Sequence, residues 1–231
     1  MSNIDIIDVK AGIEEENEGY VRQVRTFLSD KDTVFINVMA SPGAGKTTLL
    51  SKLIDELKEK YSIAVIEADV DADVDARTVS QHGAKAIQLH TGGSCHMDGR
   101  MTLSGLSALD NAGFFADHTK KKLVFLENIG NLVCPAEFDT GADIKLVLLS
   151  VPEGDDKPLK YPLMFTVADI IAVTKIDTAP VFDFDTDRFV NNVRPLNPSA
   201  PIYPVSAKNA QGLTELISEL EKVIYQHYEN H

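Results

Sequence analysis

Residues 34–50, VFINVMASPGAGKTTLL, decide the fold. The stretch begins as an apolar run typical of a buried strand, passes through a loop of small residues, and continues into an amphipathic helix. Small side chains in such a loop allow a diphosphate to approach successive backbone N–H groups closely. The helix that follows directs its positive end at the same point. The stretch therefore predicts a phosphate-binding loop between a strand and a helix.

The spacing of G-x-x-x-x-G-K-[ST] assigns a role to each residue of this loop. Lys46 would lie along the β- and γ-phosphates, and the Thr47 hydroxyl would bind the accompanying Mg²⁺. Ala40 stands where the motif has glycine, and alanine is small enough to keep the assignment. A glycine-rich turn of no function would explain neither the Lys–Thr pair nor its register. The predicted phosphate-binding residues are Gly43, Ala44, Gly45, Lys46, Thr47 and Thr48.

Length, composition and charge restrict the class of protein. With 231 residues and 44% hydrophobic content, the chain can bury one good-sized core, so we expect a single domain. The net charge of −13 argues against a nucleic-acid partner, which would require a basic surface. No window approaches about 18 apolar residues, so we expect no membrane partner. Residues 1–10 lack a basic start and an apolar core, which predicts a cytoplasmic protein.

Apolar runs of strand length recur along the chain and are nearly continuous in β-branched and aliphatic residues. Such runs are typical of a parallel sheet that is covered on both faces. The predicted strands are 34–40, 63–68, 85–89, 122–126, 144–151, 170–174 and 202–205, and predicted helices include 13–28, 47–61, 101–109 and 212–228. We therefore predict an α/β P-loop NTPase fold with a mostly parallel central sheet flanked by helices on both faces. Residues 1–231 would form one domain, with a loose tail at 1–12, an N-terminal helix at 13–30 covering a sheet edge, and the nucleotide-binding part at 34–231.

Acidic residues crowd into residues 67–77, EADVDADVDAR, at the carboxyl end of the second predicted strand. Carboxylates this close to a triphosphate repel each other unless a cation lies among them, which predicts Mg²⁺ here. Asp69 is nearest the strand end and is the predicted Mg²⁺ ligand. Asp75 is predicted to sense the γ-phosphate from a mobile segment, and both are candidate catalytic residues. Asp71 and Asp73 are expected to face water at a helix start.

A second acidic strand end follows residues 122–126, where the chain continues as Glu127-Asn128-Ile129-Gly130-Asn131. Glu127 would support the Mg²⁺ or its waters and is a further candidate catalytic residue. The Gly130 N–H would bond the γ-phosphate. The pattern E-x-x-G is common by itself, and its position after a long apolar strand gives it weight.

Two loops near the end of the chain predict guanine as the base. Asp177 could accept hydrogen bonds from guanine N1 and N2, whereas adenine offers no such donor pair. Lys175 would pack its stem along the ring, and the Ala207 N–H would bond guanine O6. These loops, Thr174-Lys175-Ile176-Asp177 and Ser206-Ala207-Lys208, resemble the [NT]KxD and SAK elements of GTPases, which makes residues 34–231 a G domain. Thr174 replaces the commoner Asn, which leaves open whether the loop-bracing hydrogen bond of that Asn is kept.

Cys95 and Cys134 are the two cysteines, and His96 adjoins the first. Two thiolates and an imidazole favour Zn²⁺ or Ni²⁺, with room for a fourth ligand. Free cysteines are also common as small core residues, so chemistry alone leaves both interpretations open. Cys134 follows Gly130 by four residues, so a movement of the γ-phosphate sensor could distort a metal site there.

With these residues assembled, the chain resembles the HypB family, GTPases that assist nickel insertion during [NiFe]-hydrogenase maturation and belong to the same broad class as UreG. The resemblance rests on PGAGKTTLL, IEADVDADVDAR, TGGSCHMD and above all ENIGNLVCP at residues 127–135. It implies Ni²⁺ or Zn²⁺ at Cys95, His96 and Cys134, near the interface of a homodimer that forms with GTP. UreG proteins carry a Cys-Pro-His order that this chain lacks. The N-terminal nickel-storage motifs of some HypB proteins are also absent.

The resemblance implies a GTPase that turns over slowly and hands Ni²⁺ to a hydrogenase large-subunit precursor, with HypA-like maturation proteins as partners. Slow turnover is expected because the sequence shows no obvious catalytic arginine, Arg77 being the one candidate. A metal carrier for which GTP is only an allosteric ligand is one alternative, and a UreG-type urease helper is another. An ATP-dependent ligase or kinase on the same core is a third.

Overall fold

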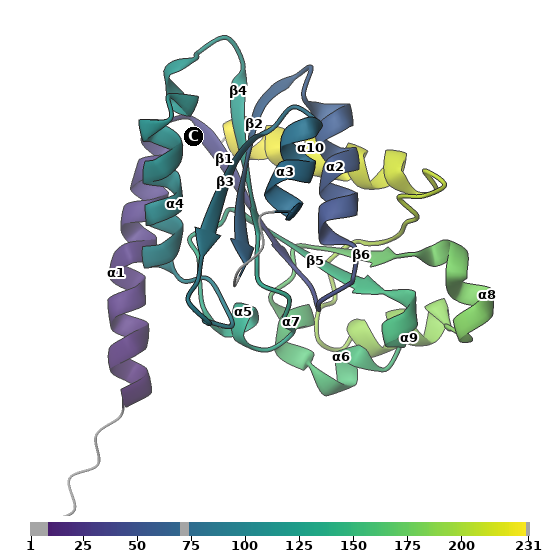
Figure 1. Cartoon of the computed structure of the whole chain (residues 1–231). Coiled ribbons are helices and arrows are strands. Elements are labelled where there is room, and N and C mark those ends of the chain that lie inside the picture. Colours follow the sequence, from purple (N-terminus) through teal and green to yellow (C-terminus); the bar gives the residue numbers. More distant parts are fainter. Residues whose placement is uncertain (1–8, 70–73, 230–231) are drawn as a thin grey trace, which may run out of the picture.

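The computed structural model describes residues 9–69 and 74–229. Residues 1–8 of the predicted tail lie outside this part of the chain, as do Asp71 and Asp73. The strands within it form one sheet in the order β3-β2-β4-β1-β5-β6-β7, and neighbouring named strands pair in parallel (Figure 1). The strands are β1 (Thr33–Met39), β2 (Tyr61–Asp69), β3 (Lys85–His90), β4 (Lys121–Glu127), β5 (Ile144–Ser150), β6 (Ile170–Thr174) and β7 (Ile202–Pro204).

Helices cover both faces of the sheet, which confirms the predicted fold class (Figure 1). The longer helices are α1 (Val9–Asp30), α2 (Lys46–Leu57), α3 (Val74–Gln81), α4 (Gly99–Asn111), α9 (Thr186–Val193) and α10 (Leu213–Glu229). The short ones are α5 (Cys134–Glu137), α6 (Lys157–Lys160), α7 (Pro162–Thr166) and α8 (Ala179–Phe182), with 3₁₀ turns η1 (Phe114–Ala116), η2 (Val151–Glu153) and η3 (Ile176–Thr178).

Side chains of β1 alternate between two cores because successive residues of a strand face opposite sides of the sheet. Ile36 and Val38 are buried with the apolar faces of α2 and α10. Phe35 is buried on the other face with residues of α1 and α4, and Met39 on that face with residues of α7 and α9. The fully buried strand β1 therefore contributes side chains to the cores on both faces of the sheet.

Three predictions about helices are wrong. The N-terminal helix does not cover a sheet edge, because Val24 and Leu28 of α1 pack with Phe35 over the middle of a face. It also begins at Val9, so residues 9–12 of the predicted loose tail are helical. The helix after the phosphate loop ends at Leu57 and not at residue 61, because the chain turns there and Tyr61 opens β2.

The sheet brings the predicted functional loops to one edge. In a parallel sheet the carboxyl ends of the strands lie together, and ligands bind where the strand order reverses. Here the order reverses at β1, which lies between β4 and β5, so the loops after β1, β2 and β4 adjoin one another. Within residues 9–69 and 74–229, no helix has both the length and the apolar character needed to cross a membrane.

Candidate functional site

The predicted phosphate loop joins β1 to α2. Gly43 and Gly45 have φ values of +74° and +94°, in the left-handed region that favours glycine. Gly45 is the residue that caps α2, and Lys46 and Thr47 open the helix. A cap without a side chain leaves the first N–H groups of the helix available to an anion. The loop therefore has the backbone that a bound phosphate requires.

Two residues at the end of β6 brace this loop from the side. The Thr174 hydroxyl donates a hydrogen bond to the Ala44 carbonyl at 2.6 Å, in a buried position. The Lys175 ammonium donates to the Gly43 carbonyl at 2.7 Å. The brace that the sequence left open is thus made by threonine, which has a donor that reaches the loop just as an Asn would.

A cavity of about 300 Å³ lies beside the phosphate loop at the ends of β6 and β7. The backbone N–H of Ile176 donates to the Val205 carbonyl at 3.1 Å, which ties together the two loops that are predicted to contact the base. Ser206 is fully buried and its N–H donates to the Gln211 carbonyl at 2.9 Å, so it closes its own loop. The lining includes these predicted nucleotide-binding residues: Ala44, Gly45, Thr48, Lys175, Asp177, Ser206, Ala207 and Lys208.

A buried acidic group lies at the other side of the phosphate loop. Glu67 and Glu127 are partners in the register of β2 and β4, so their side chains emerge next to each other. Asp75, in the first turn of α3, completes a group in which one carboxylate oxygen of each residue lies within 4.8 Å of the others. The Thr47 hydroxyl donates to Glu127 Oε1 at 2.8 Å. Two predicted Mg²⁺ ligands, Thr47 and Glu127, are therefore in contact.

Burial controls the charge of these carboxyl groups. Glu67 and Glu127 are 3% and 2% exposed. Burial, together with the neighbouring charge of Glu127, raises the pKa of Glu67 to about 10. Burial also raises the pKa of Glu127 above its usual range. Among the described residues, Glu67 Oε2 and Glu127 Oε2 have no hydrogen-bond partner. Hard, unpaired carboxylate oxygens at this position fit Mg²⁺, which prefers oxygen ligands.

Glu67 is a residue that the sequence analysis missed. Asp69, the predicted ligand, is not part of the acidic group, and its role stays a prediction. In the sequence, Glu67 could be noticed only as a glutamate inside the apolar run of β2. Its neighbour Glu127 is set by the register of β2 on β4, which one sequence does not reveal.

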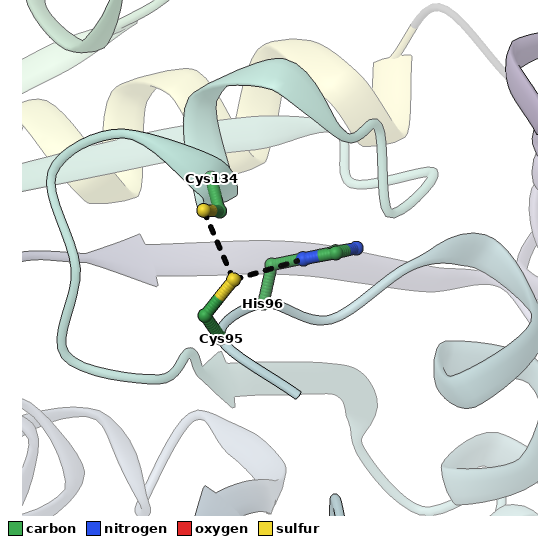
Figure 2. Close-up of side chains that lie close together, drawn as sticks. All are labelled: Cys95, His96 and Cys134. Atoms are coloured by element: carbon green, nitrogen blue, oxygen red, sulfur yellow. Dashed lines mark hydrogen bonds between the residues drawn. The ribbon is translucent and has the colours of Figure 1, made fainter. Parts of the chain in front are cut away.

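The structure brings Cys95, His96 and Cys134, the predicted metal ligands, together near the surface (Figure 2). The two Sγ atoms lie 3.0 Å apart, and Cys95 Sγ lies 3.6 Å from His96 Nδ1. The His96 ring stacks on Phe138 with centroids 3.8 Å apart, and burial lowers the pKa of His96, which favours the neutral imidazole that binds metals. The hydrogen bond between the thiols raises the pKa of Cys134.

The donor set of this thiol–imidazole group suits Zn²⁺ or Ni²⁺. A Zn–S bond of about 2.3 Å would place two tetrahedral sulfur ligands roughly 3.8 Å apart. The observed separation of 3.0 Å therefore needs only a small opening to admit a metal ion. Cys95 is exposed and Cys134 is partly exposed, so the site is accessible from solvent.

Residues 34–204 match the family model described as "CobW/HypB/UreG, nucleotide-binding domain". The hydrogenase maturation factor HypB of Rhizobium leguminosarum bv. viciae is 40% identical over 221 residues, covering 96% of this chain and 72% of that protein. The crystal structure of HypB from Helicobacter pylori in complex with nickel is similar with a TM-score of 0.85 and 34% identity, covering 92% of this chain and 97% of the other. The chain belongs to the HypB family. The HypB structure from Archaeoglobus fulgidus gives a TM-score of 0.81 and 31% identity over 91% of this chain and 99% of that one.

Membership of the HypB family confirms the resemblance drawn from the motifs. The family model begins at the first residue of the phosphate-loop stretch and extends to the end of β7, so it includes the acidic group, the thiol–imidazole group and Asp177. The chain is therefore a P-loop nucleotide-binding protein of a nucleotide-hydrolase family. Its metal-site candidates lie inside the nucleotide-binding domain and not on a separate appendage.

Proposed function

We propose that this protein hydrolyses GTP and couples the hydrolysis to the binding and release of nickel, assisting nickel insertion into a [NiFe]-hydrogenase precursor. The observation that carries the proposal is the short distance between the two candidate sites. A Cβ added to Gly130 would lie 2.8 Å from the backbone nitrogen of Pro42, so Gly130 lies directly against the phosphate loop. Four residues later, Cys134 lies beside Cys95. HypB family membership and the nickel complex of the Helicobacter pylori relative support nickel as the cargo.

Positioning and charge neutralisation would supply the catalysis. Lys46 would lie along the phosphates, and the N–H of Gly130 would bond the γ-phosphate. Thr47 and Glu127, with Glu67 and Asp75 beside them, would hold Mg²⁺, which when bound neutralises charge on the phosphates. Asp69 and Asp75 remain candidates for ordering the attacking water.

Guanine selection is assigned to Asp177, which lines the base cavity together with Lys175 and Ala207. A carboxylate there pairs with the two donors of guanine and is left unpaired by adenine. This assignment separates the proposed GTPase from an ATP-dependent ligase or kinase on the same core.

The proposed partners follow from the family. We expect a homodimer in the GTP form, HypA-like maturation proteins, and a hydrogenase large-subunit precursor that receives Ni²⁺. Zn²⁺ would compete for the same two thiols and imidazole.

The proposal is tested by following nickel during a single turnover. The protein is loaded with Ni²⁺ and GTP·Mg²⁺, and the ion is followed into apo hydrogenase precursor as phosphate is released. Lys46→Ala, which lacks the phosphate-binding ammonium and keeps all three metal-ligand candidates, serves as the hydrolysis-deficient variant. We expect nickel transfer to follow phosphate release in the parent and to slow with it in Lys46→Ala.

The same experiment separates the alternatives. Equal nickel transfer by the parent and by metal-loaded Lys46→Ala would establish the carrier for which hydrolysis is incidental. Transfer to a urease precursor, with none to the hydrogenase precursor, would establish the urease helper. A protein with no change in nickel binding across GTP, GDP and nucleotide-free forms would contradict the proposal altogether.

A further inference from the structure

The segment from Glu127 to Asn131 is tied to the phosphate loop by its backbone. The N–H of Asn128 donates to the Val38 carbonyl at 3.1 Å, at the end of β1. The N–H of Asn131 donates to the Ala40 carbonyl at 2.8 Å, at the first residue of the loop. Between these two bonds, Gly130 has no room for a side chain against Pro42. A displacement of the phosphate loop therefore reaches the backbone of Asn131 directly.

The side chains of the same two asparagines reach the other way, to the loop that carries Cys95 and His96. Asn128 Oδ1 accepts the N–H of Met97 at 3.3 Å. Asn131 Nδ2 donates to the Cys95 carbonyl at 3.4 Å. The asparagines thus hold the Cys95–His96 pair from both sides.

Asn128 and Asn131 differ in how firmly they are fixed. Asn128 is 1% exposed, and its Nδ2 donates to Oδ1 of the equally buried Asn37 at 3.1 Å, inside the sheet. Asn131 is half-buried, and its Oδ1 accepts the N–H of Val133 at 2.8 Å, in the turn that leads to Cys134. Asn128 is therefore anchored inside the sheet, whereas Asn131 joins three separate segments: the phosphate loop, the Cys95 loop and the turn that leads to α5.

We propose that Asn131 is the positioning residue through which the nucleotide state sets the affinity of Cys95, His96 and Cys134 for a divalent transition metal. The proposal rests on the proposed coupling of hydrolysis to metal handling and names the residue that transmits it. When the backbone of Asn131 moves with the phosphate loop, its amide changes the distance between the two sulfur ligands, because it bonds the carbonyl of Cys95 and the N–H of Val133, the residue next to Cys134. Asn128 keeps the far side of the Cys95 loop in place during that change.

Asn17 of α1 provides a matched control. Its Oδ1 accepts the N–H of Gly99 at 2.8 Å, and its Nδ2 donates to the Asp139 carbonyl at 2.9 Å. It therefore links the two chain segments that flank the metal ligands, as Asn131 does, but from the side of the N-terminal helix. Neither of these two bonds involves Glu127–Asn131, so the contribution of Asn17 should be the same in every nucleotide state.

The test measures metal affinity in two nucleotide states. Ni²⁺ alone is titrated, against a competing chelator, into the full-length protein saturated with GDP·Mg²⁺ or with a non-hydrolysable GTP analogue and Mg²⁺. The thiolate-to-nickel charge-transfer absorbance reports ligation. We expect the two dissociation constants of the parent to differ by a factor on the order of 5–150, the usual range for linked sites. In Asn131→Ala this factor should fall to about 1, whereas Asn17→Ala should weaken nickel binding in both states and keep the parental factor.

Reciprocity supplies a second readout, because nickel must change nucleotide affinity by the same factor as nucleotide changes nickel affinity. Asn131→Asp keeps the acceptor for Val133 and removes the donor to Cys95, so it tests the same contact if the alanine variant does not fold. A parent with equal nickel affinities in both states would defeat the proposed function itself. A parent that shows coupling, together with Asn131 variants that retain it, would overturn the assignment to Asn131 and leave the proposed function standing.

Discussion

Glu67 should make the stability of the cation-free protein fall as pH rises. Its pKa is about 10 in the folded protein, because of burial and the neighbouring Glu127, against a usual value of 4.5. Between these two pH values Glu67 is ionised in the unfolded chain and protonated in the folded protein. Each rise of one pH unit therefore lowers the free energy of unfolding by about 1.4 kcal/mol. From about pH 5 to about pH 7, the free energy of unfolding should drop by roughly 2–3 kcal/mol through this residue alone.

Glu67→Gln removes the titrating group and keeps the shape of the side chain. Urea unfolding at several pH values, with nucleotide and Mg²⁺ removed, should give a much flatter dependence for this variant than for the parent. The exposed Glu59, in the turn that follows α2, provides the control, and Glu59→Gln should follow the parent. Parallel pH profiles for the parent and Glu67→Gln would refute the reasoning, because they would mean that Glu67 is already ionised in the folded protein.

Three further substitutions test the nucleotide site. Thr174→Val leaves the Ala44 carbonyl without its hydrogen-bond donor, so the free energy of unfolding should fall by about 1–3 kcal/mol and GDP binding should weaken. Thr174→Asn should retain the parental stability and GDP affinity. Urea unfolding measures the stability, and titration with GDP measures the affinity. Gly130→Ala places a methyl group against Pro42 and should weaken binding of a GTP analogue by about 1–3 kcal/mol, while the affinity for GDP changes less. Equal losses of affinity for both nucleotides would contradict γ-phosphate sensing by Gly130. Asp177→Asn should narrow the preference for GTP over ATP by about 1–3 kcal/mol in competition binding, and an unchanged preference would count against the base assignment.

The strands and the phosphate loop could be predicted because their signals are local. A run such as Ile144–Ser150 is apolar at nearly every position, and a sheet covered on both faces is the arrangement that buries such a run. The grouping of Cys95, His96 and Cys134 could also be expected, since two thiols and an imidazole suit one metal ion and Cys134 lies four residues beyond Gly130, the predicted γ-phosphate sensor.

The contacts that join these parts could not be predicted from one sequence. Glu67 is one of several acidic residues in its segment, and only the parallel register of β2 on β4 singles it out as the neighbour of Glu127. The amphipathic pattern of the N-terminal helix indicates that one face of the helix is buried, but it does not indicate which part of the sheet that face packs against. Asn131 resembles any loop residue until both chain segments that it contacts are placed in space.

The strand order explains why one segment can serve both sites. β4 lies between β1, which carries the phosphate loop, and β2, which carries Glu67, and the chain that leaves β4 at Glu127 must pass over the ends of both. The Cys95 loop comes from β3 at the sheet edge and has to cross toward α4, which packs beside α1 on the face of β2 and β4. The two paths therefore meet where β4 ends, at Asn128 and Asn131. If β4 were an edge strand, a thiolate four residues beyond Gly130 would have no second cysteine to meet, so the proposed coupling of nucleotide to metal depends on the central place of β4 in this sheet.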